Sequence, residues 1–379
     1  MSDTSNLRTW IEVDTSAIAH NVSVFRSLIP ATTKLGGVVK SNAYGHDFIQ
    51  FAQELIKLGV DWLLVDSMVE AIALRREGIT TPILVLGYTL PDMMNAALEN
   101  DIQLSISSFE NIEAAIAIAK VQSKSLNIHI KIDTGMNRQG FVESQREQLI
   151  TLLKENKEYL NIVGVFTHFA AAKNPALPND THKQIDRFNP WREAFINAGF
   201  KPLFHAAATG GTLLYPEAHL DLVRVGIGLY GLWPSTEARQ YLKGQVELKP
   251  ALSWKTIIGE IKSVPKCERV GYDFTESLRR QTQLAICPVG YWHGFSRKLS
   301  GIGEVLVNGQ CAKVIGRVSM DMIAIDVTDI ANANVGAEVI LIGRQGDEEI
   351  TAYQMAALDD TSWYETVTRL NPLIKRIYR

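Results

Sequence analysis

The sequence predicts an α/β protein that contains a (β/α)8 barrel of the TIM type, followed by a mostly β C-terminal domain. Short β-rich runs alternate with longer amphipathic helical patterns through the first two-thirds of the chain. Several of these runs are almost continuously apolar, which is typical of parallel strands covered on both faces. After about residue 240 the helical patterns become sparse. We therefore expect a barrel over residues 1–240 and a β-rich domain over residues 241–379.

Eight runs account for a closed barrel, and they are expected at 35–40, 61–66, 82–87, 102–107, 127–133, 162–169, 202–208 and 220–226. Residues 67–78 and 111–120 repeat apolar side chains at helical spacing between such runs. An open doubly wound sheet is the alternative, but no glycine-rich dinucleotide turn follows the first strand. The count of eight strand–helix units favours the closed barrel.

The C-terminal domain is expected to hold strands at 253–264, 283–292, 304–316 and 322–330 and a late helix at 361–370. Asn308-Gly309 predicts a tight hairpin within the third of these runs. The early run at 8–14 is expected to pair with this domain.

Composition excludes several classes of protein. The 379 residues are 46% hydrophobic and 21% charged, with a net charge of −3, so neither nucleic acid nor a membrane is an expected partner. The N-terminus lacks a signal-peptide pattern, and no apolar stretch is long enough to span a bilayer. Three widely spaced cysteines without a CxxC motif predict free thiols in a cytoplasmic protein, and no metal site.

The carboxyl ends of the predicted barrel strands carry residues that are suited to catalysis or ligand binding. They are Lys40, Lys131, Arg138, His168, Thr209 with Gly210-Gly211, Arg224 and Gly226-Ile227. A strand-end lysine that loses its proton is a nucleophile toward carbonyl groups. Glycines at the last two strand ends let backbone N–H groups approach a phosphate. Together these features suggest pyridoxal 5′-phosphate (PLP) held by Lys40 as a Schiff base.

Each residue also has an ordinary structural explanation. Lys40 could be a surface lysine, His168 a hydrogen-bonded core residue, and Arg224 a salt-bridge residue of the barrel. Lys131 alternates with Asp133 and could simply contact it. The residues by themselves leave these alternatives open.

Seven motifs, in order along the chain, resemble the signatures of the alanine racemase family. They are VVKSNAYGHD, KIDTGMNRQGF, VFTHFAAA, VRVGIGLYG, ERVGYDFT, PVGYWHGF and VIGRVSMDMIAIDV. The resemblance implies the barrel and β domain, PLP, a homodimer and interconversion of L-alanine and D-alanine. It also implies supply of D-alanine for cell-wall peptidoglycan.

The resemblance further implies a role for each matching residue. Lys40 resembles the lysine that binds the cofactor and serves the D-isomer's proton, and Tyr272 resembles the second base, which serves the L-isomer's proton. Arg224 resembles the partner of the pyridine nitrogen, and His168 links it to Tyr272. The implied phosphate contacts are Tyr44, Thr209, Gly226, Ile227 and Tyr364. Arg138 and Met320 resemble contacts of the substrate carboxylate, and Lys131 a lysine that is often carbamylated. Tyr272 and Met320 would complete the partner subunit's site.

Several positions depart from the family pattern. They are Ala208, Asp273, Trp292-His293, Ser319 and Ser362. They leave open a PLP-dependent racemase of another small amino acid, such as serine. A fold-related amino-acid decarboxylase and a barrel protein that only carries the cofactor are further alternatives.

Overall fold

The structure is a computed structural model that describes residue 4 and residues 6–379, so residues 1–3 and 5 of the predicted barrel domain lie outside it. Its internal contacts divide the chain into two compact units. The barrel unit contains Ala17–Ala43 and Phe48–Pro250. The β unit contains the described residues up to Ser16, then Tyr44–Asp47 and Ala251–Arg379.

Eight parallel strands form the barrel, in the order β8-β7-β6-β5-β4-β3-β2-β9. Their bounds are β2 (Lys34–Val38), β3 (Trp62–Val65), β4 (Ile83–Val85), β5 (Ile102–Ile106), β6 (Leu126–Lys131), β7 (Leu160–Phe166), β8 (Leu203–His205) and β9 (Leu222–Val225). Backbone bonds from Asp221 N to Phe204 O (3.0 Å) and from Arg224 N to Ala207 O (2.9 Å) join the last two segments. The predicted (β/α)8 fold is confirmed.

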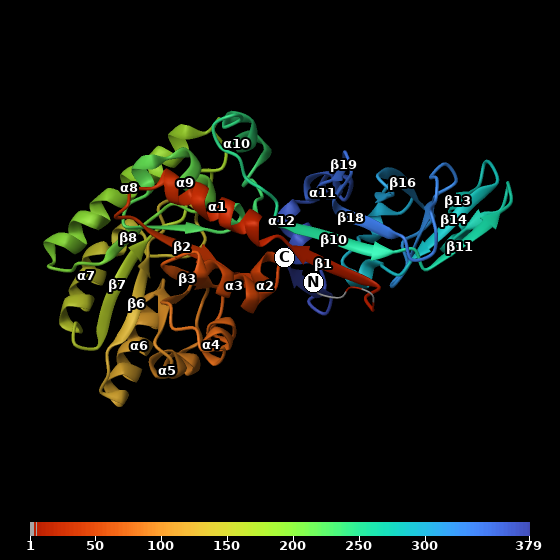
Figure 1. The fold of residues 1–379 in the computed structure, drawn as a ribbon. Helices are drawn as coiled ribbons and strands as arrows, with labels where there is room; N and C mark the ends of the chain where they lie inside the picture. Colours follow the sequence, from red (N-terminus) through yellow and green to blue (C-terminus); the bar gives the residue numbers. More distant parts are fainter. Residues whose placement is uncertain (1–3, 5) are drawn as a thin grey trace. The chain divides into compact units, whose positions relative to one another are not determined.

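Helices lie outside these strands (Figure 1). They are α1 (Thr15–Leu28), α3 (Phe48–Lys57), α4 (Met68–Arg76), α5 (Pro91–Glu99), α6 (Phe109–Gln122), α7 (Arg146–Glu155), α8 (Pro178–Asn197), α9 (Thr209–Leu214) and α10 (Thr236–Tyr241). In α6 the buried residues Ile112, Ala115, Ile116 and Ala119 recur at helical spacing, as the sequence predicts. Ser67 and Ser108 cap α4 and α6 by accepting hydrogen bonds from backbone N–H groups.

The first barrel strand is shorter than predicted, and Lys40 does not belong to it. The strand β2 ends at Val38, and the short element α2 (Lys40–Tyr44) follows. Ser41, Asn42, Ala43 and Tyr44 all have left-handed backbones, with φ between 47° and 57°. This conformation costs roughly 1–2 kcal/mol per residue for L-amino acids. The sequence gives little sign of it, because of these four residues only asparagine adopts such angles readily.

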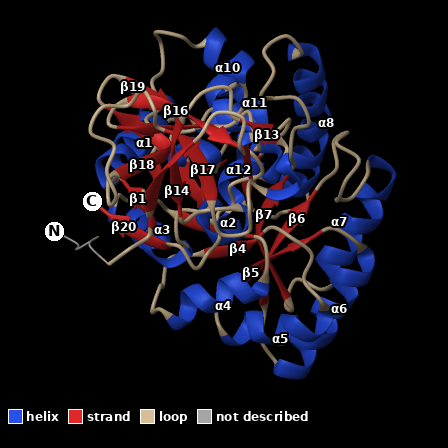
Figure 2. Ribbon diagram, turned by 90° about the vertical axis from the view of Figure 1, so that its right-hand side faces the viewer, coloured by secondary structure: helices blue, strands red, loops and turns tan. Residues whose placement is uncertain are grey.

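The β unit contains a ten-stranded sheet, most of it antiparallel (Figure 2). Its strands are β1 (Thr9–Val13), β10 (Leu252–Ile257), β11 (Glu260–Val264), β14 (Thr282–Cys287), β15 (Glu304–Val307), β16 (Gln310–Ile315), β17 (Ile323–Asp326), β18 (Glu338–Gln345), β19 (Glu348–Ile350) and β20 (Lys375–Tyr378). A separate pair contains β12 (Arg269–Val270) and β13 (Glu276–Ser277), and the helices are α11 (Ala352–Leu358) and α12 (Trp363–Thr368).

Several predicted elements of this unit appear, with changed bounds. The expected strand at 8–14 forms β1, which pairs with β10 and β20. The hairpin at Asn308-Gly309 joins β15 to β16, with φ of 50° and 75° at the turn. The single run predicted at 253–264 is wrong, because the chain breaks at Ile258-Gly259 and the two halves join different partner strands. The strands β18, β19 and β20 and the helix α11 were not predicted.

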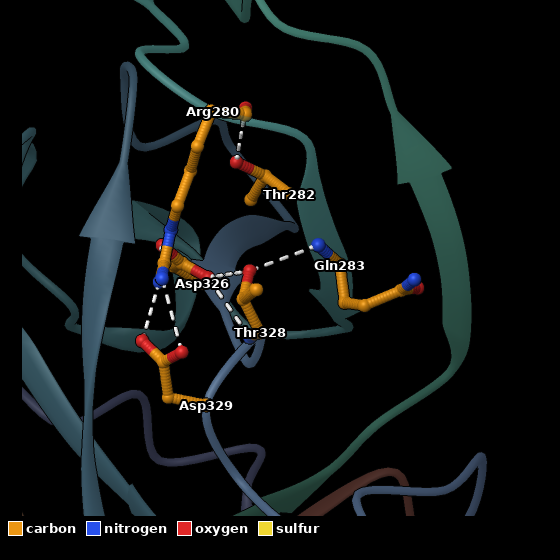
Figure 3. Close-up of polar contacts among 6 residues, drawn as sticks. All are labelled: Arg280, Thr282, Gln283, Asp326, Thr328 and Asp329. Carbon is orange, nitrogen blue, oxygen red and sulfur yellow. Dashed lines mark hydrogen bonds and ion pairs between the residues drawn. The ribbon is translucent and has the colours of Figure 1, made fainter.

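A polar cluster at the beginning of β14 and the end of β17 fixes the connection that follows β17 (Figure 3). The guanidinium of Arg280 donates to both carboxylate oxygens of Asp329, at 2.9 and 2.5 Å. Thr328 N donates to Asp326 Oδ1 at 2.9 Å, and Thr328 Oγ1 accepts from Gln283 N at 3.0 Å. These groups are largely exposed, so we assign them a local structural role.

Within the part of the chain that the structure describes, no helix is long and apolar enough to cross a membrane. The same residues contain no cluster of three histidine, cysteine or acidic side chains that could hold a metal ion.

Candidate active site

The Lys40 amine lies beside a carboxylate from the next strand-end loop. Lys40 Nζ donates to Asp66 Oδ1 at 2.9 Å, and both side chains are partly exposed. Asp66 follows β3, so the contact joins the loops after the first two barrel strands. The carboxyl ends of barrel strands are where this fold places its chemistry.

A second amine is buried on β6. Lys131 Nζ donates to Gln139 Oε1 at 3.0 Å and lies 5.7 Å from the centre of the Phe166 ring. Burial, and after it the charges of Arg138 and Arg224, lower the pKa of Lys131 to about 8. The Lys131 amine thus hydrogen-bonds to Gln139, and not to Asp133 as in the alternative considered above.

The Asp133 carboxylate instead organises the turn that carries Arg138. It accepts hydrogen bonds from the backbone N–H groups of Gly135, Asn137 and Arg138, at 2.8–3.1 Å. The turn places the exposed Arg138 after β6. An acidic residue followed by Gly-Met-Asn is a turn signal, but the three bonds depend on the folded backbone.

Arg224 is a second buried cation of the site. On β9 its guanidinium donates to Thr167 O at 2.8 Å, to Ala206 O at 3.0 Å and to His168 Nδ1 at 3.3 Å. It also lies 5.1 Å from the centre of the Phe166 ring. Burial lowers its pKa to about 9, so the group still carries its charge at neutral pH. The hydrogen bonds of Arg224 thus go to neutral acceptors, and not to a carboxylate as in the barrel salt bridge considered above.

His168 shows that the predicted residues converge. Its pKa falls to about 3 because of burial and then because of the charges of Arg224, Arg138, Lys131 and Lys40. Four cations, predicted from three strand ends, therefore act on one imidazole. The cluster carries more positive than negative charge, which suits an anionic ligand.

A chain of buried side chains continues from Arg224 into the barrel, and sequence reasoning did not identify it. Arg224 contacts His205 Nδ1 at 2.9 Å, His205 Nε2 lies 2.9 Å from His129 Nδ1, and His129 Nε2 lies 2.8 Å from Gln103 Oε1. The signal was present, since each of these residues interrupts an apolar strand run. Buried polar side chains of this kind require partners, but the sequence does not say which ones.

Thr209 begins α9, as the sequence suggests, and its hydroxyl oxygen accepts hydrogen bonds from backbone N–H groups. Thr209 Oγ1 accepts from Gly226 N at 3.1 Å and from Gly228 N at 3.4 Å. A Cβ on Gly228 would lie 2.4 Å from the Phe25 ring, so close packing requires glycine there. The hydroxyl keeps its own proton, which it could donate to a bound phosphate.

Four of the predicted site residues belong to the β unit. Tyr44 and Tyr364 have ring centres 6.3 Å apart, and burial raises the pKa of Tyr364. Tyr272 and Met320 are 67% and 54% exposed, so both are available for contact outside their own unit.

The local structure around Tyr272 explains one departure from the family pattern. Asp273 has a left-handed backbone with φ of 58°, which is why glycine suits that position. In this chain the Asp273 carboxylate also lies 2.9 Å from Arg317 Nε, as a partly exposed ion pair. Aspartate is among the few residues that tolerate this conformation.

The departures at Trp292, His293 and Ser319 gather beside Met320. Tyr291 N donates to Ser319 O at 3.0 Å, and Trp292 N donates to Met320 O at 2.9 Å. A Cβ on Gly290 would lie 2.2 Å from Ser319 O, so this loop contact requires glycine. The backbone of Trp292 therefore contacts Met320, the predicted substrate contact, and the Trp292 side chain is exposed.

Comparison with known proteins decides the family. The model of the alanine racemase N-terminal domain matches residues 13–234, and that of the C-terminal domain matches residues 251–378. The chain belongs to the alanine racemase family. The predicted family, and with it a PLP-dependent isomerase, is confirmed.

Alanine racemases resemble the chain over almost its full length. Alanine racemase 2 of Oceanobacillus iheyensis is 39% identical over 371 residues, covering 98% of this chain and 93% of the relative. The alanine racemase of Symbiobacterium thermophilum is 38% identical, covering 98% and 97%. The Bacillus anthracis enzyme, solved with bound L-Ala-P, is 38% identical, with a TM-score of 0.92 and coverage of 98% and 95%. The Bartonella henselae enzyme, solved with covalently bound pyridoxal phosphate, is 26% identical, with a TM-score of 0.87 and coverage of 98% and 99%.

Proposed function

We propose that the protein interconverts L-alanine and D-alanine, with PLP held by Lys40. The observation that supports this most directly is the group of cations around His168. Arg224 donates to His168 Nδ1 at 3.3 Å, and the charges of Lys40, Lys131 and Arg138 also lower the pKa of His168. This group occurs at strand ends of a barrel whose chain belongs to the alanine racemase family. The product D-alanine would supply peptidoglycan synthesis.

The residues present fit PLP. The cofactor carries an aldehyde, an anionic phosphate and a pyridine nitrogen. Lys40 offers the amine, the Thr209 hydroxyl retains a donor, and Arg224 offers a fixed guanidinium. Tyr44, Tyr364 and the backbone of Gly226 and Ile227 are the further proposed phosphate contacts. Bound PLP supplies an electron sink for the electron pair left when the α-proton of alanine is removed.

Two side chains of this chain would move protons, one on each face of the substrate. Lys40 would serve one face and Tyr272 of the partner subunit the other. A tyrosine needs help to act near neutral pH, since its ordinary pKa is about 10. Arg224 has only donors, so His168 Nδ1 accepts its hydrogen bond and Nε2 keeps the proton. A neutral His168 can thus donate to a phenolate oxygen, which favours the basic form of Tyr272.

Arg138 and the backbone N–H of Met320 are the proposed contacts of the substrate carboxylate. Lys131 is the proposed site of carbamylation. Its lowered pKa, about 8, leaves part of the amine neutral at physiological pH, and only a neutral amine reacts with carbon dioxide. Mass spectrometry of the intact chain in bicarbonate buffer, compared with Lys131→Arg, tests this assignment.

We propose that the active unit is a cytoplasmic homodimer, in which Tyr272 and Met320 complete the site of the partner. The exposure of both side chains supports this arrangement. Mixing the inactive variants Lys40→Ala and Tyr272→Phe should restore part of the activity, because one of the two composite sites then has both bases. Confirmed subunit exchange without recovery of activity would refute the shared site.

The deciding experiment is a panel of L- and D-amino acids, followed by polarimetry and by a coupled D-amino-acid oxidase assay. We expect racemisation of alanine well above that of serine. Faster racemisation of serine would make the enzyme a serine racemase. The departures from the family pattern around Met320 would then be the first candidates for the changed substrate preference. Carbon dioxide release without racemisation would indicate a decarboxylase, and bound PLP without turnover a carrier.

A further inference from the structure

The Glu70 carboxylate on α4 connects the loops that follow the first two barrel strands. Glu70 Oε1 accepts from Ser41 N at 2.7 Å, and Glu70 Oε2 accepts from Asp66 N at 2.7 Å. Ser41 is the residue after Lys40, and Asp66 is the residue whose carboxylate accepts from the Lys40 amine. One side chain therefore holds both neighbours of Lys40.

The turn that begins at Lys40 needs such support. Its residues have left-handed backbones, which L-amino acids adopt only at a conformational cost. Within the turn, Ala43 N donates to Val39 O at 2.9 Å, and at its exit Asn42 Oδ1 accepts from Phe48 N at 3.1 Å. At its entry the acceptor is Glu70, and a bond to a carboxylate is stronger than one to a neutral acceptor.

Glu70 performs two tasks with two different oxygen atoms. Oε2 also accepts from Ser67 N at 3.3 Å, while Ser67 Oγ accepts from Glu70 N at 3.4 Å, which together form the capping box of α4. A glutamine can serve in a capping box. Only a carboxylate can accept at both ends, because a glutamine side chain presents one oxygen and one NH2 donor. The helix cap alone does not require glutamate, whereas accepting from Asp66 N and Ser41 N at the same time does.

We propose that Glu70 is a positioning residue that fixes the Lys40 amine for capture of PLP. The proposal rests on the proposed function, in which Lys40 binds the cofactor. Capture forms a C=N bond between the Lys40 nitrogen and the aldehyde carbon of PLP, and one water molecule leaves. Glu70 touches neither reacting atom and acts through the backbone of Ser41 and through Asp66.

The test compares two variants of the full-length protein. Glu70→Gln keeps the capping box when its remaining oxygen accepts from Ser67 N and Asp66 N, and its NH2 group then faces Ser41 N–H. Ser67→Ala removes half of the capping box but leaves both contacts of Glu70 with these N–H groups. Wild type and variants are purified with PLP, stripped with hydroxylamine and dialysed, and PLP is added back. The visible absorbance of the bound cofactor reports the rate of capture, and borohydride reduction with peptide mapping confirms Lys40.

We expect Glu70→Gln to capture PLP at least about tenfold more slowly than wild type, the effect of losing one charge-assisted hydrogen bond. Ser67→Ala should stay within about twofold of wild type, although its thermal unfolding temperature falls, because a lost helix cap affects stability and not the contact with Ser41. Glu70→Gln should unfold close to the wild-type temperature.

Two results would overturn the proposal. One is capture by Glu70→Gln at the wild-type rate, and the other is equal slowing in Ser67→Ala, which would reduce Glu70 to a helix cap. If the wild type captures PLP on a different lysine, the proposed function fails as well. If the wild type racemises alanine while Glu70→Gln captures PLP normally, this proposal alone fails.

Discussion

Arg224 and His205 are joined by a buried hydrogen bond of 2.9 Å that sets the protonation of two histidines. A guanidinium has no acceptor, so His205 Nδ1 must accept and His205 Nε2 must carry the proton. His205 Nε2 then donates to His129 Nδ1, and His129 Nε2 donates to Gln103 Oε1. Both imidazoles are therefore neutral in the folded protein, in agreement with the lowering of their pKa values by burial and by Arg224.

The neutral histidines predict a loss of stability in acid. His129 and His168 have folded pKa values of about 3, whereas an unfolded histidine titrates near 6.5. Between these values the unfolded chain binds more protons than the folded one, so the free energy of unfolding rises with pH and falls on acidification. Near pH 5 the variant His129→Gln should take up about one proton fewer on unfolding than wild type. Denaturant unfolding across pH 4.5–7 measures this slope, and equal slopes would contradict a neutral His129.

The second prediction concerns Gly164 on β7. A Cβ there would lie 2.2 Å from His129 Nδ1, so Gly164→Ala forces the imidazole away from His205. Overpacking of this kind costs about 1–3 kcal/mol of unfolding free energy. Gly259→Ala is the control, because its added Cβ would meet its nearest neighbour at an ordinary 3.5 Å. Chemical denaturation should show a clear loss for the first variant and little for the second.

The third prediction tests the left-handed turn through Ser41, whose φ is 57°. Ser41→Gly should leave stability unchanged or raise it by up to about 1 kcal/mol, since glycine adopts this backbone without steric cost. Ser41→Val should lower it by more than about 1 kcal/mol, because a β-branched side chain disfavours the left-handed region. Thermal unfolding of both variants decides the point, and the reverse order would exclude a left-handed Ser41.

The fourth prediction concerns the second base. Phenylalanine at position 272 keeps the ring but cannot move a proton, so Tyr272→Phe should slow racemisation by about 10²–10⁴-fold in both directions. In deuterated water the variant should still exchange the α-hydrogen of D-alanine through Lys40, while exchange into L-alanine nearly stops.

The absorbance of bound PLP provides the control for this variant, because Tyr272 is not a proposed cofactor contact. Similar exchange of both isomers in the folded variant would show that Tyr272 is not the second base. Tyr291 and His293, in the loop beside Met320, would be tested next.

The sequence by itself determined the barrel and the mostly β C-terminal part, and it predicted most residues of the candidate site. Periodicity and apolar runs are local properties, so they located all eight barrel strands and the hairpin at Asn308-Gly309. The motifs assigned Lys40, Arg224 and Tyr272 their proposed roles, because residue type and order along the chain can be read directly from the sequence.

Only the tertiary structure decided which groups meet. The bridge from Glu70 to Ser41 and the path from Arg224 to Gln103 join residues from different strands and loops. Hydrogen bonds of this kind depend on distances between segments far apart in the sequence, which no local pattern encodes. For the same reason the sequence predicted Lys131 as a site residue but not that its amine would donate to Gln139.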